Sequence, residues 1–106
     1  MDDERFKALA NGTRRAVLKL VRDEAQPVGE LARALGVSQP AMSQHLGVLR
    51  EAGLVAVEAR GQRRFYRAEA VGIRAAQRFF DDYWSSSLDR LAEAAGAAAG
   101  SRRSAS

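Results

Sequence analysis

The sequence feature that most constrains the fold is the stretch from residue 28 to residue 54, VGELARALGVSQPAMSQHLGVLREAGL. Its apolar residues recur with the spacing of two short helices. They are Leu31, Ala32 and Leu35 in the first helix, and Met42, Leu46 and Leu49 in the second. The last three lie at i, i+4 and i+7 and form one stripe, so we expect the second helix to bury that side and expose a polar one.

Turn chemistry marks where these two helices begin and end. Gly36 can take the left-handed conformation that ends the first helix, and Gly53 can end the second in the same way. Ser38 can cap the second helix, and Pro40 falls in its first turn, where a missing N–H costs little. Two short helices, a glycine-containing turn and a polar outer face predict a helix-turn-helix, whose second helix enters the major groove of DNA.

Length, composition and the N-terminus narrow the class of protein. The chain has 106 residues, enough for one domain with a modest core. It contains no cysteine, which excludes disulfides, thiolate metal sites and thiol redox switches. No segment is long and apolar enough to span a membrane, and the charged start MDDERFK does not resemble a signal peptide. We therefore expect a cytoplasmic protein with no membrane partner.

The residues before the central stretch predict two further helices. A first short helix begins at the acidic residues 2–4, which favour its positive N-terminal end. Thr13 can cap a second helix, with Val17 facing inward and Arg14 in solvent. Pro27 breaks the chain before the central stretch, and a few residues here can pair as a minor strand.

After Leu54 the hydrophobic period changes from helical to two. Residues 55–60 alternate, residues 65–67 form a second run, and Gly61 and Gln62 suit a two-residue hairpin loop with glycine first. A basic hairpin directly after a DNA-reading helix is the arrangement of a winged helix. The alternative is an ordinary edge hairpin whose arginines discourage aggregation. The predicted fold is mostly α with a small β-hairpin, a winged helix-turn-helix of about five helices and a two-stranded wing.

Charge distribution points to nucleic acid more clearly than net charge does. The formal charge is +4, and two of the positive residues are Arg102 and Arg103 near the C-terminus. Between residues 38 and 68, however, five arginines face only two acidic residues. A solvated basic surface is the simple alternative for any one of them, but a basic cluster next to a helix-turn-helix favours phosphate contact. The predicted DNA contacts of the wing are Arg60, Arg63 and Arg64.

The exposed positions at the start of the second motif helix have side chains suited to reading bases. The predicted DNA-binding residues there are Ser38, Gln39, Ser43, Gln44 and His45. Gln44 can grip adenine through N6 and N7, Ser43 can contact several bases, and Ser38 with the helix N-terminus can hold a phosphate. The alternative for the two glutamines is a solvated helix face.

His45 is the only histidine, and we weigh three roles for it. It can contact a DNA phosphate or base, pack as a half-buried structural residue, or, remotely, act as a metal ligand or catalyst. No carboxylate or thiolate partners for a metal are evident nearby. No catalytic set is visible either, so we expect neither an enzyme nor a cofactor.

The pattern becomes helical again from Glu69 to about residue 95, and the helix carries an aromatic face. A helix of that length is roughly 35–40 Å long, more than so small a domain can cover. The usual role of such a face is core packing, but its excess apolar surface predicts pairing with a second chain. The predicted dimer-interface residues are Phe6, Leu9, Phe80, Tyr83, Trp84, Leu88 and Leu91. We expect one domain over residues 1–95 and a flexible tail over residues 96–106.

Several segments together resemble a known family. LANGTRRAVLKLV, then VGELARALGVSQPAMSQHLGVLREAGLVAVEARGQRRFYR, are similar to ArsR-type winged-helix transcriptional regulators over roughly residues 6–67. The resemblance implies a homodimer joined through its first and last helices, and repression that an inducer relieves. It also implies DNA-binding roles for Ser38, Gln39, Ser43, Gln44, His45 and Arg63.

The chain departs from this family at the sensor. Metal-sensing members carry cysteines in the first motif helix, or histidines and carboxylates on the last helix. Here the first motif helix reads GELARAL and the last helix has no histidine, so we expect no metal at the usual sites. Gly47 stands where many members have a basic residue, and it lowers local helix stability.

Two other functions remain open at this point. One is a protein-interaction module that uses the winged helix as a scaffold, and the other is a switch gated by a small molecule lodged between the last helices near Phe80 and Trp84. Five arginines between residues 38 and 68 are difficult to explain on a purely protein-binding surface. The prediction is therefore a dimeric regulator that reads a near-palindromic operator in double-stranded DNA.

Overall fold

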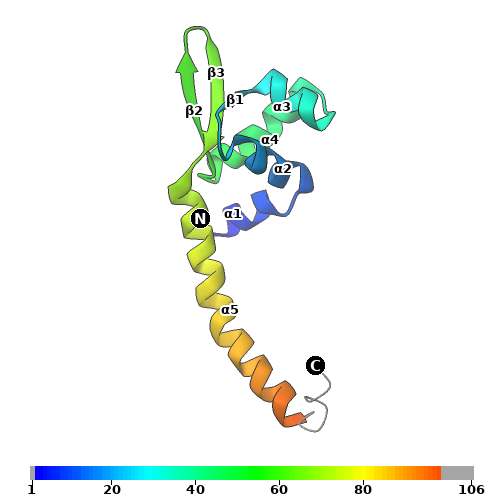
Figure 1. Ribbon diagram of the computed structural model, residues 1–106, viewed down its shortest axis with the longest axis vertical. Coiled ribbons are helices and arrows are strands. Elements are labelled where there is room, and N and C mark those ends of the chain that lie inside the picture. Colours follow the sequence, from blue (N-terminus) through cyan, green and yellow to red (C-terminus); the bar gives the residue numbers. More distant parts are fainter. Residues whose placement is uncertain (1, 99–106) are drawn as a thin grey trace. The chain divides into compact units, whose positions relative to one another are not determined.

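The computed structural model describes residues 2–98, with the side chains of residues 97 and 98 left out. The elements in chain order are α1 (Asp2–Leu9), α2 (Gly12–Val21), β1 (Gln26–Pro27), α3 (Val28–Leu35), α4 (Gln39–Glu51), β2 (Val55–Arg60), β3 (Arg63–Ala68) and α5 (Ala70–Ala98), as labelled in Figure 1. This is the predicted mostly α fold with a small hairpin. α5 continues through Ala98, past the predicted boundary at residue 95, and the rest of the predicted tail lies outside the described residues.

The chain divides into two compact units. The first, up to Ala76, contains all elements from α1 to β3 and the beginning of α5, and the second, from Gln77, is the remainder of that helix. The first unit holds the hydrophobic core. Its largest fully buried side chains are Leu31, Met42, Leu46, Leu49, Leu54, Val17 and Val21. The apolar stripe of α4 is thus at the centre of the core, as predicted.

The predicted helix ends of the central motif are confirmed. Gly36 is left-handed, with φ +66° and ψ +33°, and the Val37 N–H donates to the Ala32 carbonyl at 3.1 Å. The Ser38 hydroxyl accepts from the Ala41 N–H at 3.2 Å. Gly53 has φ +75°, and the same bonding pattern closes the end of α4. These local bonds satisfy backbone groups that a helix end leaves unpaired.

The cap of α2 differs from the prediction. Asn11, not Thr13, is the N-cap residue, and its side chain accepts from the Arg14 N–H at 3.0 Å. Asparagine is at least as good a cap as threonine, and its position lets the helix begin two residues earlier than a cap at Thr13 would.

The predicted two-stranded wing belongs to a three-stranded antiparallel sheet in the order β1-β3-β2, and the third strand confirms the minor strand expected near Pro27. The added strand is the short pair Gln26 and Pro27, opposite Tyr66 and Phe65. Proline suits this edge position because it has no N–H to offer the ladder. At the other end Gly61 alone has a positive φ in the two-residue loop, as glycine-first hairpin turns require. We call the hairpin of residues 55–68 the wing.

One close backbone contact joins the end of α4 to the start of α5. A Cβ placed on Gly72 would lie 1.8 Å from the Gly53 carbonyl oxygen, which is far inside any permitted contact distance. Nearby, the Glu69 N–H donates to the Leu54 carbonyl at 2.9 Å. The first turn of α5 can therefore pack on the α4 turn only because residue 72 has no side chain.

We predict that Gly72→Ala destabilises the protein by about 1–3 kcal/mol or more, because backbone lies on both sides of the clash and one helix must move. Gly47→Ala is the matched control, since no heavy atom lies within 4 Å of a Cβ there. That change, in an exposed helix interior, should stabilise by roughly 0.5–1 kcal/mol. Thermal and urea unfolding measure both, and a Gly72→Ala variant as stable as the parent would refute the close contact.

Candidate nucleic-acid interface

α4 presents one buried and one exposed side. Met42, Leu46 and Leu49 are at most 1% exposed, whereas Ser43 and Gln44 are exposed. Neither the Ser43 hydroxyl nor the Gln44 side-chain amide forms a hydrogen bond to the protein within residues 2–98. The predicted polar face is therefore open to solvent, and its amide and hydroxyl groups are available to an outside partner.

The N-terminal end of α4 places Ser38 and Gln39 differently. Ser38 is exposed while its hydroxyl caps the helix. Gln39 is also exposed, but its amide turns toward α3, where an added Cβ on Gly29 would lie 3.0 Å from Gln39 Nε2. The DNA contact of Gln39 stays a prediction.

His45 lies on the flank of α4, half-buried, and faces Arg14 of α2. Arg14 Nη1 lies 3.3 Å from His45 Nδ1. Because a guanidinium only donates, Nδ1 must be the acceptor, which leaves the ring proton on Nε2. This contact favours the second of the three roles weighed for His45, the half-buried structural one, and a DNA contact through Nε2 stays a prediction.

Arg14 does not stay in solvent as predicted. Its Nε donates to the Ala8 carbonyl at 2.7 Å and its Nη2 donates to the Lys7 carbonyl at 3.1 Å. One side chain thus binds two carbonyls in the last turn of α1 and also contacts α4 through His45. The sequence offered no signal for this, since it depends on how three helices meet.

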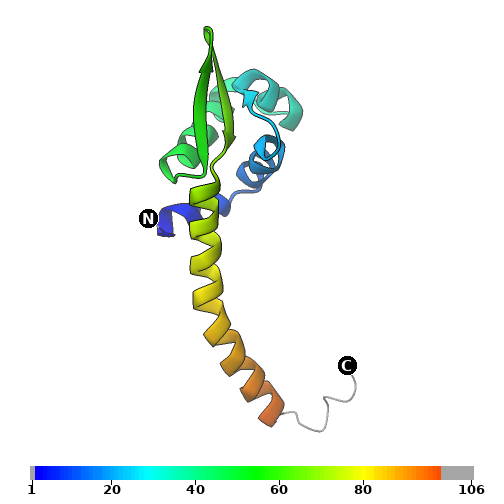
Figure 2. The same cartoon turned by 60° about the vertical axis from the view of Figure 1, so that its left-hand side comes forward.

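The three predicted wing arginines are exposed and lie near the tip, which Figure 2 shows projecting beyond the helices of its unit. Arg60 and Arg63 are direct cross-strand partners, and Arg64 points to the opposite face because side chains alternate along a strand. Two residues that were not predicted organise one of these faces. The Phe65 ring lies under Arg60 and Arg63, and Glu58 forms ion pairs with Arg60 and Arg67.

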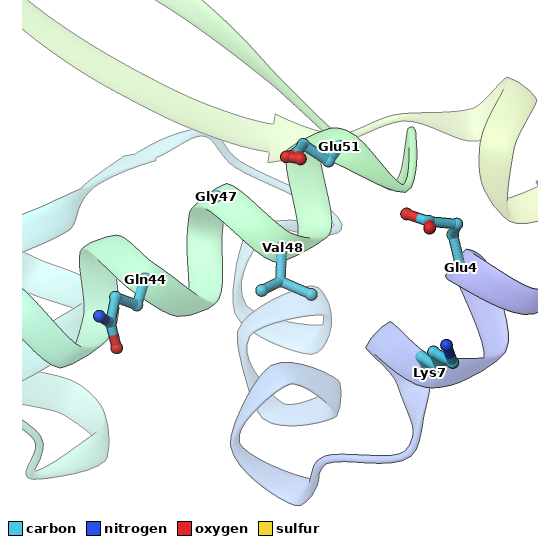
Figure 3. Close-up of a pocket in the computed structure, with 6 residues that line it drawn as sticks. All are labelled: Glu4, Lys7, Gln44, Gly47, Val48 and Glu51. Atoms are coloured by element: carbon cyan, nitrogen blue, oxygen red, sulfur yellow. The ribbon is translucent and has the colours of Figure 1, made fainter.

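A shallow hollow of about 360 Å³ lies between α1 and α4 (Figure 3). Glu4 and Lys7 of α1 line one side, and α4 supplies the other side. Val48 is the apolar part of the lining and is 41% exposed. The hollow adjoins Gln44, so the exposed face of α4 and the first helix border the same space.

The second unit exposes the aromatic face predicted for a dimer. Phe80, Tyr83, Trp84, Leu88 and Leu91 are each 41–65% exposed. The rings contact one another, with centroids 5.9 Å apart for Phe80 and Trp84 and 5.0 Å apart for Tyr83 and Trp84. The other predicted interface residues, Phe6 and Leu9, are half-buried in the first unit.

Within residues 2–98, no group of three or more histidine, cysteine, aspartate or glutamate side chains is arranged to hold a metal ion. None of the described helices has the length and apolar character needed to cross a lipid bilayer.

Comparisons with known proteins identify relatives of both sequence and fold. Residues 9–58 match a family model described as a helix-turn-helix domain. The chain is 43% identical over 91 residues to the HTH-type transcriptional regulator Rv2034 of Mycobacterium tuberculosis, covering 86% of this chain and 85% of that protein.

Two solved structures share the fold. The ArsR-like transcriptional regulator from Rhodococcus sp. RHA1 has a TM-score of 0.78 and 29% identity, over 91% of this chain and 88% of that one. The homodimeric winged helix-turn-helix domain of Mb0332 from Mycobacterium bovis, described as a possible ArsR-family regulator, has a TM-score of 0.63 and 29% identity, over 84% and 80% of the two chains. With the sequence motifs and the winged-helix architecture, these relatives show that the chain belongs to the ArsR family of winged helix-turn-helix transcriptional regulators.

Proposed function

We propose that this chain binds double-stranded DNA as a homodimer and represses transcription, with α4 in the major groove and the wing beside the phosphate backbone. The observation that carries the proposal is the two-sided character of α4. Its apolar stripe is buried, and on its opposite face the exposed side chains of Ser43 and Gln44 form no hydrogen bonds to the protein within the described residues. The protein carries out no chemistry on DNA in this proposal, and only binds it.

The exposed α4 residues suit base recognition at close range. Gln44 offers an amide that donates and accepts, which matches N6 and N7 of adenine, and Ser43 offers a hydroxyl that suits several bases. The N-terminus of α4, with Ser38, faces outward and can receive a phosphate. Arginines supply the remaining, sequence-independent attraction.

Dimerisation follows from the exposed aromatic face of α5 and from the homodimeric relative. Five large apolar side chains on one helix stripe are more than a soluble monomer ordinarily leaves uncovered. A second copy with the same stripe would cover them, with Phe6 and Leu9 of α1 in support. A twofold axis would then place two α4 helices in successive major grooves, about 34 Å apart.

A small-molecule inducer would have a place on the same helix. A hollow of about 320 Å³ in the second unit is lined by Phe80, Asp81, Asp82, Trp84, Ser85 and Leu88. A ligand there would compete with the dimer contact and so weaken binding to a twofold operator. An inducer at this site would therefore act only if the proposed dimer forms through α5.

Gln44→Ala should relax base preference at one position in each half-site, at a cost of about 1–3 kcal/mol for the preferred duplex. Selection from a random duplex library gives the base preference at each position of the operator. A mobility shift on the DNA upstream of the protein's own gene tests binding to a natural site. Lys19→Ala, an exposed cation on α2, is the control and should leave the base preferences unchanged. Base preferences that survive Gln44→Ala unaltered would remove α4 from the reading role, and an absence of duplex binding by the parent would defeat the proposal.

Trp84→Ala should weaken the dimer by about 2 kcal/mol, roughly thirtyfold in dissociation constant, because central aromatic residues dominate interfaces. Sedimentation equilibrium measures the change, and operator affinity should fall with it. Ser86→Ala lies on the opposite side of α5 and is the matched control.

Trp84 is the only tryptophan, so the tryptophan fluorescence of the parent should shift to shorter wavelength as the protein concentration rises and the dimer forms. A parent that sediments as a monomer, or a variant that dimerises as tightly as the parent, contradicts this interface.

A further inference from the structure

The wing contains more arginines than it leaves without an ion-pair partner. It holds four arginines and one acidic residue between positions 55 and 68. The strand register sorts them by face, because Arg60 pairs with Arg63, Glu58 with Phe65 and Ala56 with Arg67. Arg64 lies on the other face. Three arginines, one ring and one carboxylate therefore share a single side of the hairpin.

Phe65 is a platform for two of these arginines. The Arg60 Cζ lies 4.4 Å from the Phe65 ring centroid, and the Arg63 Cζ lies 5.3 Å from it. Like charges directly opposite one another in a sheet repel, which would drive the two guanidinium groups apart. The negative potential of the ring face attracts both and holds them over one surface.

Among the described residues, Glu58 forms ion pairs with two of the four wing arginines and leaves the other two without one. Arg60 Nε donates to Glu58 Oε2 at 3.1 Å, and Arg67 Nε lies 3.8 Å from Glu58 Oε1. Arg63 and Arg64, by contrast, form no ion pair in the described part of the chain. Arg60 and Arg67 already share a carboxylate, so a phosphate must compete with it, whereas Arg63 and Arg64 meet no such competitor.

We propose that Phe65 and Glu58 are positioning residues for DNA binding. Phe65 orients the Arg63 guanidinium for a phosphate, and Glu58 withholds Arg60 and Arg67 from the duplex. This rests on the proposed function, and it adds that the wing presents two arginines rather than four. Arg63 and Arg64 then reach outward from opposite faces of the hairpin.

The role of Phe65 is tested with the full-length protein and a labelled duplex of mixed sequence, titrated at several salt concentrations. Phe65→Leu keeps an apolar side chain but removes the ring, and affinity should fall about two- to fivefold, the value of an exposed cation–π contact. Phe65→Tyr retains a ring and should bind as the parent does. Circular dichroism and thermal unfolding report whether each variant is folded.

A double-mutant cycle separates positioning from simple packing. If Phe65 acts through Arg63, Phe65→Leu should have little further effect in an Arg63→Ala background. An equal loss in both backgrounds would overturn the role of Phe65, and so would a Phe65→Tyr variant as weak as Phe65→Leu. Arg63→Ala itself should lower the slope of log affinity against log salt by about 0.9 for each protomer on the duplex.

The role of Glu58 is tested with Glu58→Gln against Glu24→Gln, an exposed acid in the loop before β1. Both variants lose one negative charge, but only the first releases Arg60 and Arg67. Glu58→Gln should bind the mixed duplex more tightly and steepen the salt slope by about one to two for each protomer on the duplex, at about 0.9 for each released contact. If the two variants behave alike, Glu58 does not withhold arginines. A parent with no salt-dependent duplex binding would instead count against the proposed function.

Discussion

The one-sided burial of α4 is the constraint on which the rest of the molecule depends. Met42, Leu46 and Leu49 anchor the helix in the core, and this fixes its rotation about its own axis. Turning the helix by a third of a turn would place polar side chains in the core without partners, at a cost of several kcal/mol. The identity of the outward residues, with Ser43 and Gln44 among them, follows from this anchoring. The proposed recognition and the stability of the core therefore use opposite sides of the same thirteen residues.

Features that depend on local sequence could be predicted, and features that depend on how distant segments meet could not. The caps at Gly36, Ser38 and Gly53 involve bonds between residues a few positions apart, so the sequence states them almost directly. The contact of Gly72 with Gly53 leaves no such trace, because a glycine in a helix start is not distinctive until the opposing backbone is known. The same holds for the choice of cap at α2, where Asn11 and Thr13 were both competent and geometry selected one.

The candidate site shows the same division. Residue types on α4 and in the wing indicated DNA, but the partners of those residues were not evident. Arg14 joins α1 and α4 by donating to the end of one helix and facing His45 on the other. This link means that the first helix, a proposed dimer element, and the reading helix are held by one guanidinium. A shift of α1 would reach His45 through the Arg14 side chain, which would give the proposed dimer interface a short physical path to the proposed DNA-reading face.

The wing shows why a count of arginines overestimates the electrostatic attraction of a surface for DNA. A guanidinium attracts a phosphate only to the extent that it is not already neutralised, and one that shares a carboxylate gives up that interaction on binding. Glu58 therefore reduces sequence-independent attraction while the strands keep the arginines in place. Lower background attraction raises the fraction of total affinity that depends on Gln44 and its neighbours. A genome contains many competing sites. The ratio of specific to non-specific affinity therefore decides where a regulator is bound, and the affinity for one site alone does not.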